Sequence, residues 1–243
     1  MIPSRKSDDG DLGPVVPPKK KRQKKLPVGS MIFDIETCPQ DEERLLALAP
    51  NFEPDSRLKD PEKIAASIEN QKRKYIERAA LNWQTANVVL IGVSDGKEYT
   101  PIIGDEGFVL TTFFGILRSA LANRVNFGGH NVKWFDFPML VNRARVLRVS
   151  VPQELMHFRN GRPQWNEFIF DTLEIFTLGD RQRIDGHGVD DICRTFGFPG
   201  KTADGAQFPS MWKSDQSAAI AYNENDCRCE VEIAKVCGFK FNE

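Results

Sequence analysis

The sequence predicts a single α/β domain built on a mixed β-sheet, and three observations support this class. Short apolar runs with alternating polar residues, which are typical of strands, are concentrated early in the chain. Longer amphipathic or apolar runs of helical length lie between and after them. The chain has 243 residues, of which 40% are hydrophobic and 28% charged, enough for one core of ordinary size. We therefore expect helices that cover a sheet.

Strands are predicted where short apolar runs are bounded by turn residues. The run 30–36 is apolar with polar insertions that have a period of two. The runs 87–93 and 98–103 follow, separated by a Ser-Asp-Gly turn. A shorter run at 124–127 stops before two glycines, and the run 167–172 is also strand-like. These five runs form the predicted sheet.

Helices are predicted from longer runs with start and stop signals. The charge-rich segment 41–82 indicates one or two amphipathic helices, and 108–122 indicates a strongly apolar one. Residues 135–147 and 189–196 are the next two predicted helices. The last, 216–237, begins after Ser-Asp and ends at a glycine. Its apolar residues form two stripes, so we expect both of its faces to be buried.

The first thirty residues are predicted to be a disordered basic tail that precedes a domain at 31–243. Residues 1–30 contain five Pro, three Gly and few apolar side chains, so they cannot form a core. They carry a net charge of +5, whereas residues 31–243 carry −6. The basic run at 19–25 has the composition of a nuclear-import signal, a nucleic-acid arm or a solvated tail. The sequence does not choose between these.

Several classes of protein are not expected. The longest apolar runs fall far short of the roughly 20 residues that span a bilayer, and no secretory leader is recognisable. Five cysteines without regular spacing indicate neither a disulfide framework nor a zinc site. We therefore expect a cytoplasmic protein with no membrane partner, with nucleoid association or nuclear import through residues 19–25 as alternatives.

Two acidic residues stand close together on the first predicted strand. Asp34 and Glu36 are two residues apart, so their side chains project from the same face. Like charges about 7 Å apart repel each other unless a cation lies between them. A solvated strand face without function is the more common origin of such a pair. Alone, the pair is only a weak indication of a metal site.

Two further acidic motifs follow later in the chain. Asp136 lies among large apolar residues after a predicted strand, where a carboxylate would be partly buried. It is either a metal ligand or a helix N-cap, since Pro138 fits a helix start. Tyr222 and Asp226 are four residues apart on the last helix and project together. A hydrogen bond that only rigidifies the helix is the alternative for that pair.

Taken together, the three motifs resemble those of the DEDD superfamily of 3′–5′ exonucleases: Asp-x-Glu on the first strand, Asn-x(3)-Phe-Asp in the middle and Tyr-x(3)-Asp on a late helix. Tyr222 places the resemblance in the tyrosine subclass, DEDDy, because the histidine subclass would have histidine at the position of Ala221. The segment 59–92 resembles a predicted exonuclease family related to the proofreading domain of family B DNA polymerases. The resemblance spans about 31–237. It implies a ribonuclease H-like α/β fold, with a central mixed β-sheet and helices on both faces.

The resemblance also implies an activity and a set of residue roles. The chain would be a metal-dependent 3′–5′ exonuclease that removes nucleotides from the 3′ end of DNA, with single-stranded DNA favoured. Two divalent cations, Mg²⁺ or Mn²⁺, suit ligands that are all oxygen atoms. Asp34, Glu36 and Asp226 would hold one cation, Asp34 would bridge to the second, and Asp136 would act through a water molecule. Tyr222 would orient the attacking water, since a tyrosine hydroxyl is a poor base at neutral pH.

Contacts to the nucleic acid are predicted beside these motifs. The candidate substrate residues are Thr37, Asn131 and Phe135. Candidate phosphate contacts are Lys133, Arg143 and Arg145. The acidic domain is compatible with a nucleic-acid partner, because bound cations reverse the potential of a carboxylate cleft. Two alternatives stay open: an exoribonuclease with the same site, and a non-catalytic nucleic-acid-binding module that keeps the fold.

Overall fold

The computed structural model describes residues 29–155, 158–159, 162–180, 182 and 185–241. The predicted basic tail therefore lies almost entirely outside the described residues, and so does its basic run at 19–25. The first strand begins at Ser30.

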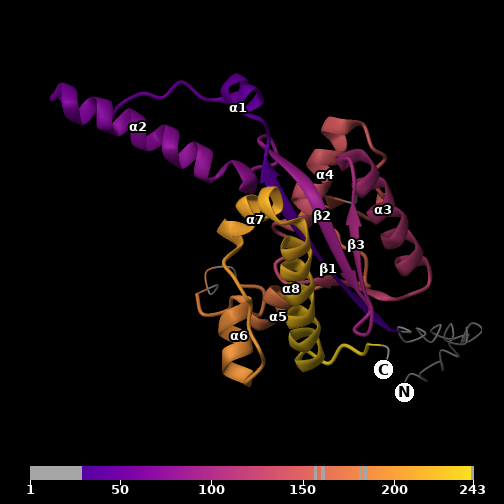
Figure 1. Ribbon diagram of the computed structural model, residues 1–243. Coiled ribbons are helices and arrows are strands. Elements are labelled where there is room, and N and C mark those ends of the chain that lie inside the picture. The colour runs from indigo at the N-terminus through magenta and orange to yellow at the C-terminus, as the bar shows by residue number, and fades with distance from the viewer. Residues whose placement is uncertain (1–28, 156–157, 160–161, 181, 183–184, 242–243) are drawn as a thin grey trace, which may run out of the picture.

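Five strands form one mixed sheet with the order β3-β2-β1-β4-β7 (Figure 1). They are β1 (Ser30–Pro39), β2 (Ala86–Ser94), β3 (Tyr99–Ile103), β4 (Asn126–Gly129) and β7 (Ile169–Asp171). The pairs β1–β2 and β2–β3 are antiparallel, whereas β1–β4 and β4–β7 are parallel. The first acidic motif therefore lies on the central strand of the sheet.

Helices cover both faces of this sheet, as predicted (Figure 1). The α-helices are α1 (Glu42–Leu48), α2 (Pro61–Glu77), α3 (Glu106–Ala122), α4 (Asp136–Leu147), α5 (Thr172–Phe176), α6 (Val189–Phe196), α7 (Phe208–Ser214) and α8 (Gln216–Val236). Short 3-10 turns lie at Ala79–Leu81, Gln153–Leu155 and Gly205–Gln207, and β5 (Phe158–Arg159) pairs with β6 (Arg162–Pro163). Helices α3 and α4 lie on one face and α8 lies on the other.

The alternation of side chains along β1 decides which residues face which helix. Phe33 packs in the core with Phe113 of α3 and Phe137 of α4, at ring-centroid distances of 4.8 and 4.9 Å. Ile32 faces the other way and packs against Val231 of α8. Because neighbouring strand residues point to opposite faces, Asp34 and Glu36 also face α8.

The last helix is buried on two sides, as the sequence predicted. Its N-cap is Asp215, whose side chain accepts a hydrogen bond from the Ala218 N–H. Val231 packs against the sheet, whereas Ile233 packs against Ile192 of α6. Helix α8 thus lies between the sheet and α6, and its side chains reach the space above β1.

The strand predicted at 124–127 begins at Asn126 instead and contains the two glycines that were expected to end it. A Cβ atom on Gly128 would lie 2.2 Å from the Phe170 carbonyl oxygen, and one on Gly129 would lie 2.6 Å from the Phe33 carbonyl oxygen. Glycine is required here because the neighbouring strands approach so closely. The strand predicted at 167–172 is also shorter, since Asp171 caps α5 with hydrogen bonds to the first turn of that helix.

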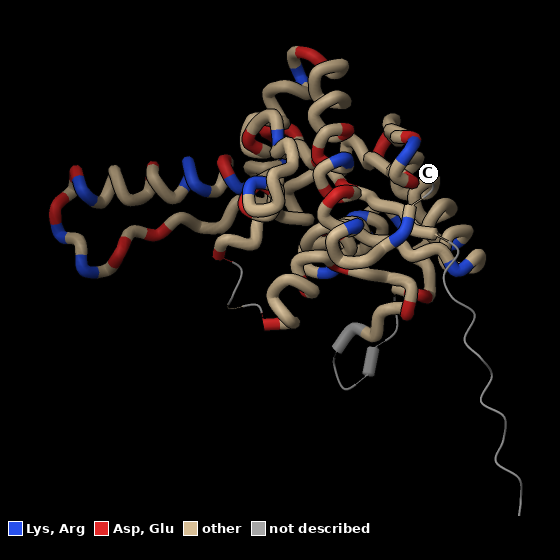
Figure 2. Tube along the Cα trace, turned by 90° about the horizontal axis from the view of Figure 1, so that it is seen from below, with Lys and Arg blue, Asp and Glu red and all other residues tan. Residues whose placement is uncertain are grey.

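Between β1 and β2 the chain extends away from the domain as an arm, defined as residues 42–77 (Figures 1 and 2). The prediction of one or two helices at 41–82 is confirmed by α1 and α2. Asp60 caps α2, and Pro61 is its first residue. No residue of α2 is fully buried, so this helix adds nothing to the domain core.

Candidate metal centre

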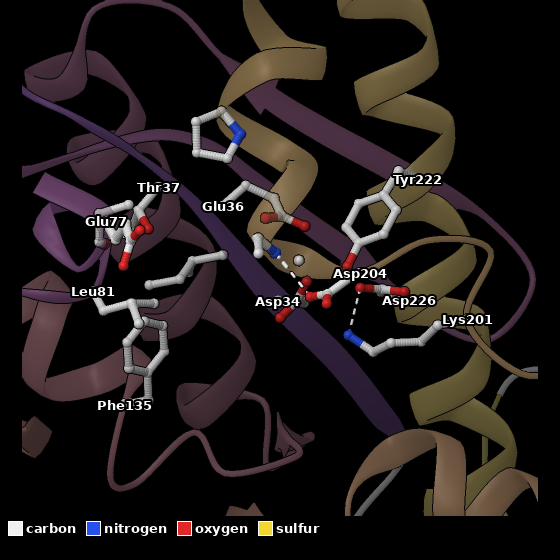
Figure 3. Close-up of a pocket in the computed structure, with 15 residues that line it drawn as sticks. Asp34, Glu36, Thr37, Glu77, Leu81, Phe135, Lys201, Asp204, Tyr222 and Asp226 are labelled. Carbon is white, nitrogen blue, oxygen red and sulfur yellow. Dashed lines mark hydrogen bonds and ion pairs between the residues drawn. The ribbon is translucent and has the colours of Figure 1, made fainter. Parts of the chain in front are cut away.

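Three carboxylates from distant parts of the sequence meet in one pocket. Asp34 and Glu36 of β1 and Asp226 of α8 offer oxygen atoms that all lie within 4.8 Å of one another (Figure 3). Asp226 is 2% exposed, and its Oδ1 atom is buried without a hydrogen-bond partner among the described residues. An unpartnered carboxylate oxygen in such a position is unfavourable. A divalent cation bound between the three carboxylates would remove this penalty, so the residues fit a metal.

Burial shifts the protonation equilibria of this group. It raises the pKa of Asp34 to about 7, against the opposing charge of Lys201 and with a further increase from Asp226. Burial also raises the pKa of Glu36 well above its ordinary value, and the charge of Asp34 adds to this effect. Protons therefore compete with cations for the group around neutral pH, because a ligating carboxylate must be ionised.

Lys201 occupies the edge of the same pocket, which sequence reasoning did not predict. Its Nζ atom lies 2.6 Å from Asp226 Oδ2. Its backbone N–H donates a 2.7 Å hydrogen bond to Asp190 Oδ1, which fixes the loop before α7. Burial lowers the pKa of Lys201, but Asp226 and Asp34 raise it more strongly, to above its ordinary value. The ammonium group therefore balances part of the acidic charge.

Asn223 holds the carboxylates of β1 in position. The sequence did not predict a role for this residue either. Its Nδ2 atom donates to Asp34 Oδ2 at 2.8 Å and to Glu36 Oε1 at 3.4 Å. Its Oδ1 atom accepts a 2.9 Å hydrogen bond from the Tyr99 hydroxyl. A Cβ atom on Gly92 would lie 2.0 Å from Asn223 Oδ1, so glycine at this position of β2 makes room for the amide.

Asp136 lies beside the three-carboxylate group but is not part of it. It is 3% exposed, and its Oδ1 atom accepts a 3.3 Å hydrogen bond from the Ile35 N–H of β1. Burial raises its pKa, and the charge of Asp34 raises it further. The alternative of a helix N-cap is wrong, because Phe135 precedes α4 and no side chain caps that helix.

Tyr222 and Asp226 line the same pocket one helical turn apart. Burial raises the pKa of Tyr222 above its ordinary value, and the charge of Asp226 raises it further. The phenol is therefore neutral at physiological pH. It can donate a hydrogen bond but cannot serve as a base.

Two of the three predicted substrate residues line this pocket, which has a volume of about 420 Å³. Thr37 and Phe135 belong to its wall, together with Leu81, at the end away from Lys201 (Figure 3). Thr37 also donates a 2.7 Å hydrogen bond to the Ala80 carbonyl. Asn131 is not among the lining residues. Its backbone has a φ of 64°, and its N–H donates to Asp171.

Two of the predicted phosphate contacts have structural partners instead. Arg143 is 4% exposed and forms a 2.6 Å ion pair with Glu106 of α3, so the prediction that it contacts substrate is wrong. Lys133 forms a 2.6 Å ion pair with Glu174. Arg145 is exposed on α4. Lys133 and Arg143 therefore stabilise the fold through these ion pairs.

A further buried acid, Glu230, lies on α8 one helical turn after Asp226. Glu230 is 4% exposed, and its Oε2 atom has no hydrogen-bond partner among the described residues. Burial raises its pKa well above the ordinary value, with further increases from Asp34 and Asp136. Its spacing of four residues from Asp226 was the signal in the sequence, since such residues share one face of a helix.

Residues 76–230 match the family described as "Predicted 3'-5' exonuclease related to the exonuclease domain of PolB". This range covers more than half of the chain, so the chain belongs to this family of predicted 3′–5′ exonucleases. Its class is therefore that of an enzyme with a nucleic-acid substrate. The match includes Asp136, Tyr222 and Asp226 and begins after the first motif on β1.

The fold is also similar to that of a solved DNA polymerase. The family B DNA polymerase from the hyperthermophilic archaeon Pyrobaculum calidifontis matches with a TM-score of 0.52 and 17% identity. The match covers 85% of this chain and 24% of the polymerase, so the chain spans about a quarter of that protein's length. At this identity the likeness shows the fold, a ribonuclease H-like α/β domain.

No curated protein matches the chain significantly. Within the described residues, every helix is too short or too polar to cross a bilayer.

Proposed function

We propose that the chain is a metal-dependent 3′–5′ exonuclease of the DEDDy subclass that removes mononucleotides from single-stranded DNA. The observation that carries this proposal is the convergence of Asp34, Glu36 and Asp226 within 4.8 Å. The pocket that contains them also holds Tyr222. Membership of the exonuclease family supports the same activity.

Asp34, Glu36 and Asp226 would hold the divalent cations. Ligands that are all carboxylate oxygens favour Mg²⁺ or Mn²⁺ over Zn²⁺. When bound, such cations would activate the attacking water and stabilise the negative charge that develops on the phosphate and the leaving 3′ oxygen. Asp136, beside Asp34 and bonded to the Ile35 N–H, would orient a water molecule at the edge of the centre.

The remaining residues of the pocket would position the substrate and the water. Tyr222, whose phenol is neutral at physiological pH, would donate a hydrogen bond that orients the water and lowers the entropic barrier. Lys201 would give up its contact with Asp226 when a cation binds there, and its ammonium group would then be available to a phosphate oxygen.

The other end of the pocket suits the terminal base. Phe135 and Leu81 form an apolar surface there, with Thr37 beside them (Figure 3). Stacking on an aromatic ring tolerates every base, which an exonuclease of mixed sequences requires. The volume of about 420 Å³ lies within the range of small-ligand sites.

An end-labelling assay tests this proposal. Single strands of DNA and RNA with the same sequence, labelled at the 5′ end, are incubated with Mg²⁺ and the wild-type protein, Asp34→Ala or Glu224→Gln. Glu224 is exposed on α8, so its substitution is the matched control. We expect a ladder of single-nucleotide steps on DNA with the wild type and the control, and none with Asp34→Ala.

Two other outcomes would replace the proposal. Equal or faster shortening of RNA would identify an exoribonuclease, because the 2′-hydroxyl distinguishes the two substrates. Binding without shortening of either strand, at saturating Mg²⁺ and Mn²⁺, would identify a non-catalytic nucleic-acid-binding module.

A further inference from the structure

We propose that the base of the arm carries a second nucleic-acid site, which binds the single strand upstream of the terminal nucleotide. This inference rests on the proposed function and extends it to a surface outside the metal centre. The site, called the arm cleft, has a volume of about 470 Å³. Its lining residues are Pro50, Asn51, Phe52, Gln71, Lys74, Tyr75, Arg78, Asn82 and Thr85.

The arm cleft and the catalytic pocket are neighbours on one segment of chain. Glu77 and Leu81 line the catalytic pocket, whereas the residues that follow them, Arg78 and Asn82, line the arm cleft. In a helical segment, consecutive side chains point about 100° apart. The two cavities therefore lie on adjacent sides of the last turn of α2 and the 3-10 turn that follows it.

The polarity of degradation, from the 3′ end toward the 5′ end, decides which part of the strand can reach the arm cleft. An enzyme that removes one nucleotide at a time from a 3′ end holds a single nucleotide on the 3′ side of the cleaved bond. Any nucleotide bound beyond the catalytic pocket must therefore belong to the upstream part of the strand. The pocket wall at Glu77 and Leu81 belongs to the segment in which the arm returns to the domain, and the cleft lies on the adjacent side of that segment, so a strand that leaves the pocket past this wall meets the cleft.

The charge of the arm cleft suits a phosphate backbone. Lys74 and Arg78 are both exposed, and no Asp or Glu is among the lining residues. Neither basic side chain has an acidic partner within the described part of the chain, although acidic residues are frequent along the arm (Figure 2). Two unpaired cations at the margin of an open cleft are an electrostatic site for consecutive phosphates.

The cleft also offers aromatic surface in a fixed position. The half-buried rings of Phe52 and Tyr75 lie 5.8 Å apart and 69° from parallel. The Tyr75 hydroxyl donates a 2.8 Å hydrogen bond to the Leu45 carbonyl, and Gln71 Nε2 donates one of 2.8 Å to the Glu53 carbonyl. These bonds connect α2 to α1 and to the segment between the two helices, so the rings are held in place. Aromatic rings beside unpaired basic groups are the combination that binds single strands without sequence preference.

The decisive experiment compares two double variants with equal loss of charge. Lys74→Ala/Arg78→Ala removes both cations of the arm cleft. Lys63→Ala/Lys72→Ala removes two exposed cations of the same helix that line neither cavity, and serves as the matched control. Fluorescence anisotropy with labelled single-stranded DNA of 3 and 12 nucleotides in EDTA measures binding without metal-dependent hydrolysis. Steady-state kinetics with Mg²⁺ measures turnover on the same strands.

We expect the cleft variant to bind the 12-nucleotide strand about 10-fold more weakly than the wild type, and the control to bind it normally. The slope of log affinity against log salt should decrease by about 1.4, the value for two single-strand phosphate contacts. Binding of the 3-nucleotide strand should not change. KM for the longer strand should rise about 10-fold while kcat is preserved. Phe52→Leu, which keeps the apolar packing but removes the ring, should weaken binding of the longer strand by at least about fivefold.

The outcomes separate this inference from the proposed function. If the cleft variant binds the longer strand as well as the control does, with an unchanged salt slope, the arm cleft is not a nucleic-acid site, whether or not the enzyme is active. If the wild type degrades neither DNA nor RNA but the cleft variant still loses affinity for the longer strand, the arm cleft stands and the proposed nuclease activity fails.

Discussion

The amide of Asn223 donates a 2.8 Å hydrogen bond to the carboxylate of Asp34, across 189 positions of sequence. The same Nδ2 atom also reaches Glu36, so one side chain of α8 orients both carboxylates of β1. Substituting such an outer-sphere partner typically lowers metal affinity or activity by about 10- to 100-fold. We predict a loss of this size in Mn²⁺ affinity for Asn223→Ala, measured by titration calorimetry at pH 8.

Tyr99→Phe provides a graded comparison. It removes only the 2.9 Å hydrogen bond that the Tyr99 hydroxyl donates to Asn223 Oδ1. The amide would keep its bonds to Asp34, so the loss of Mn²⁺ affinity should be smaller than for Asn223→Ala. Wild-type Mn²⁺ affinity in Asn223→Ala would show that the amide does not orient the carboxylates.

Tyr222→Phe separates positioning from metal binding. The phenylalanine would keep the packing against Phe208, whose ring lies 6.0 Å from that of Tyr222, and would lose only the hydroxyl. By analogy with the loss of one oriented transition-state hydrogen bond, we predict a decrease of roughly 10- to 1000-fold in kcat. Mn²⁺ affinity should be largely unchanged. An unaltered kcat would exclude Tyr222 from the reaction.

Lys201→Met tests whether the ammonium group competes with the cation. Its Nζ atom lies 2.6 Å from Asp226 Oδ2, where a metal ion would bind. We predict that the variant binds Mn²⁺ about 10-fold more tightly at pH 8.5, because removing a nearby positive charge favours another cation. Lys235→Met, at the exposed end of α8, is the control. Weaker Mn²⁺ binding by Lys201→Met than by this control would contradict the prediction.

The raised pKa of Asp34 predicts an unusual dependence of stability on pH. Burial raises this pKa from 3.8 to about 7, so between these values the folded protein binds a proton that the unfolded chain does not. The free energy of unfolding of the metal-free protein should therefore fall as the pH rises from about 4 to about 7. Asp34→Asn should remove this part of the pH dependence in thermal unfolding.

Divalent cations should act in the opposite direction, because they compete with protons for the same oxygens. A cation at 100 times its Kd stabilises a protein by about 2.7 kcal/mol. We predict that Mn²⁺ raises Tm more at pH 8.0 than at pH 5.5, relative to EDTA. An increase at pH 5.5 as large as that at pH 8.0 would show that the ion binds elsewhere.

The elements that carry the site were predictable because their signals are local. Alternation along β1 places Asp34 and Glu36 on one face, whatever the rest of the chain does. The cap at Asp215 and the following apolar stripes define α8 and the shared direction of Tyr222 and Asp226. Short-range periodicity was therefore enough to predict the direction in which these four side chains point.

The partners of these residues were not predictable, because burial and pairing depend on distant segments. Asn223 was recognisable only once β1 lay beside it, and Lys201 comes from a loop without any regular pattern. Arg143 was misassigned for the same reason, since its partner Glu106 lies 37 positions away. For the arm, the pattern at 41–82 predicted helices but not that α2 stays outside the core and packs through Tyr75 on Phe52, in the segment before it.

Anomalous diffraction from a crystal soaked in Mn²⁺ and a nucleoside monophosphate tests the metal centre most directly. We predict strong anomalous density between the carboxylates of Asp34, Glu36 and Asp226, with Lys201 displaced from Asp226 and the nucleotide base against Phe135. Saturating Mn²⁺ with no anomalous density between these three carboxylates would contradict the account.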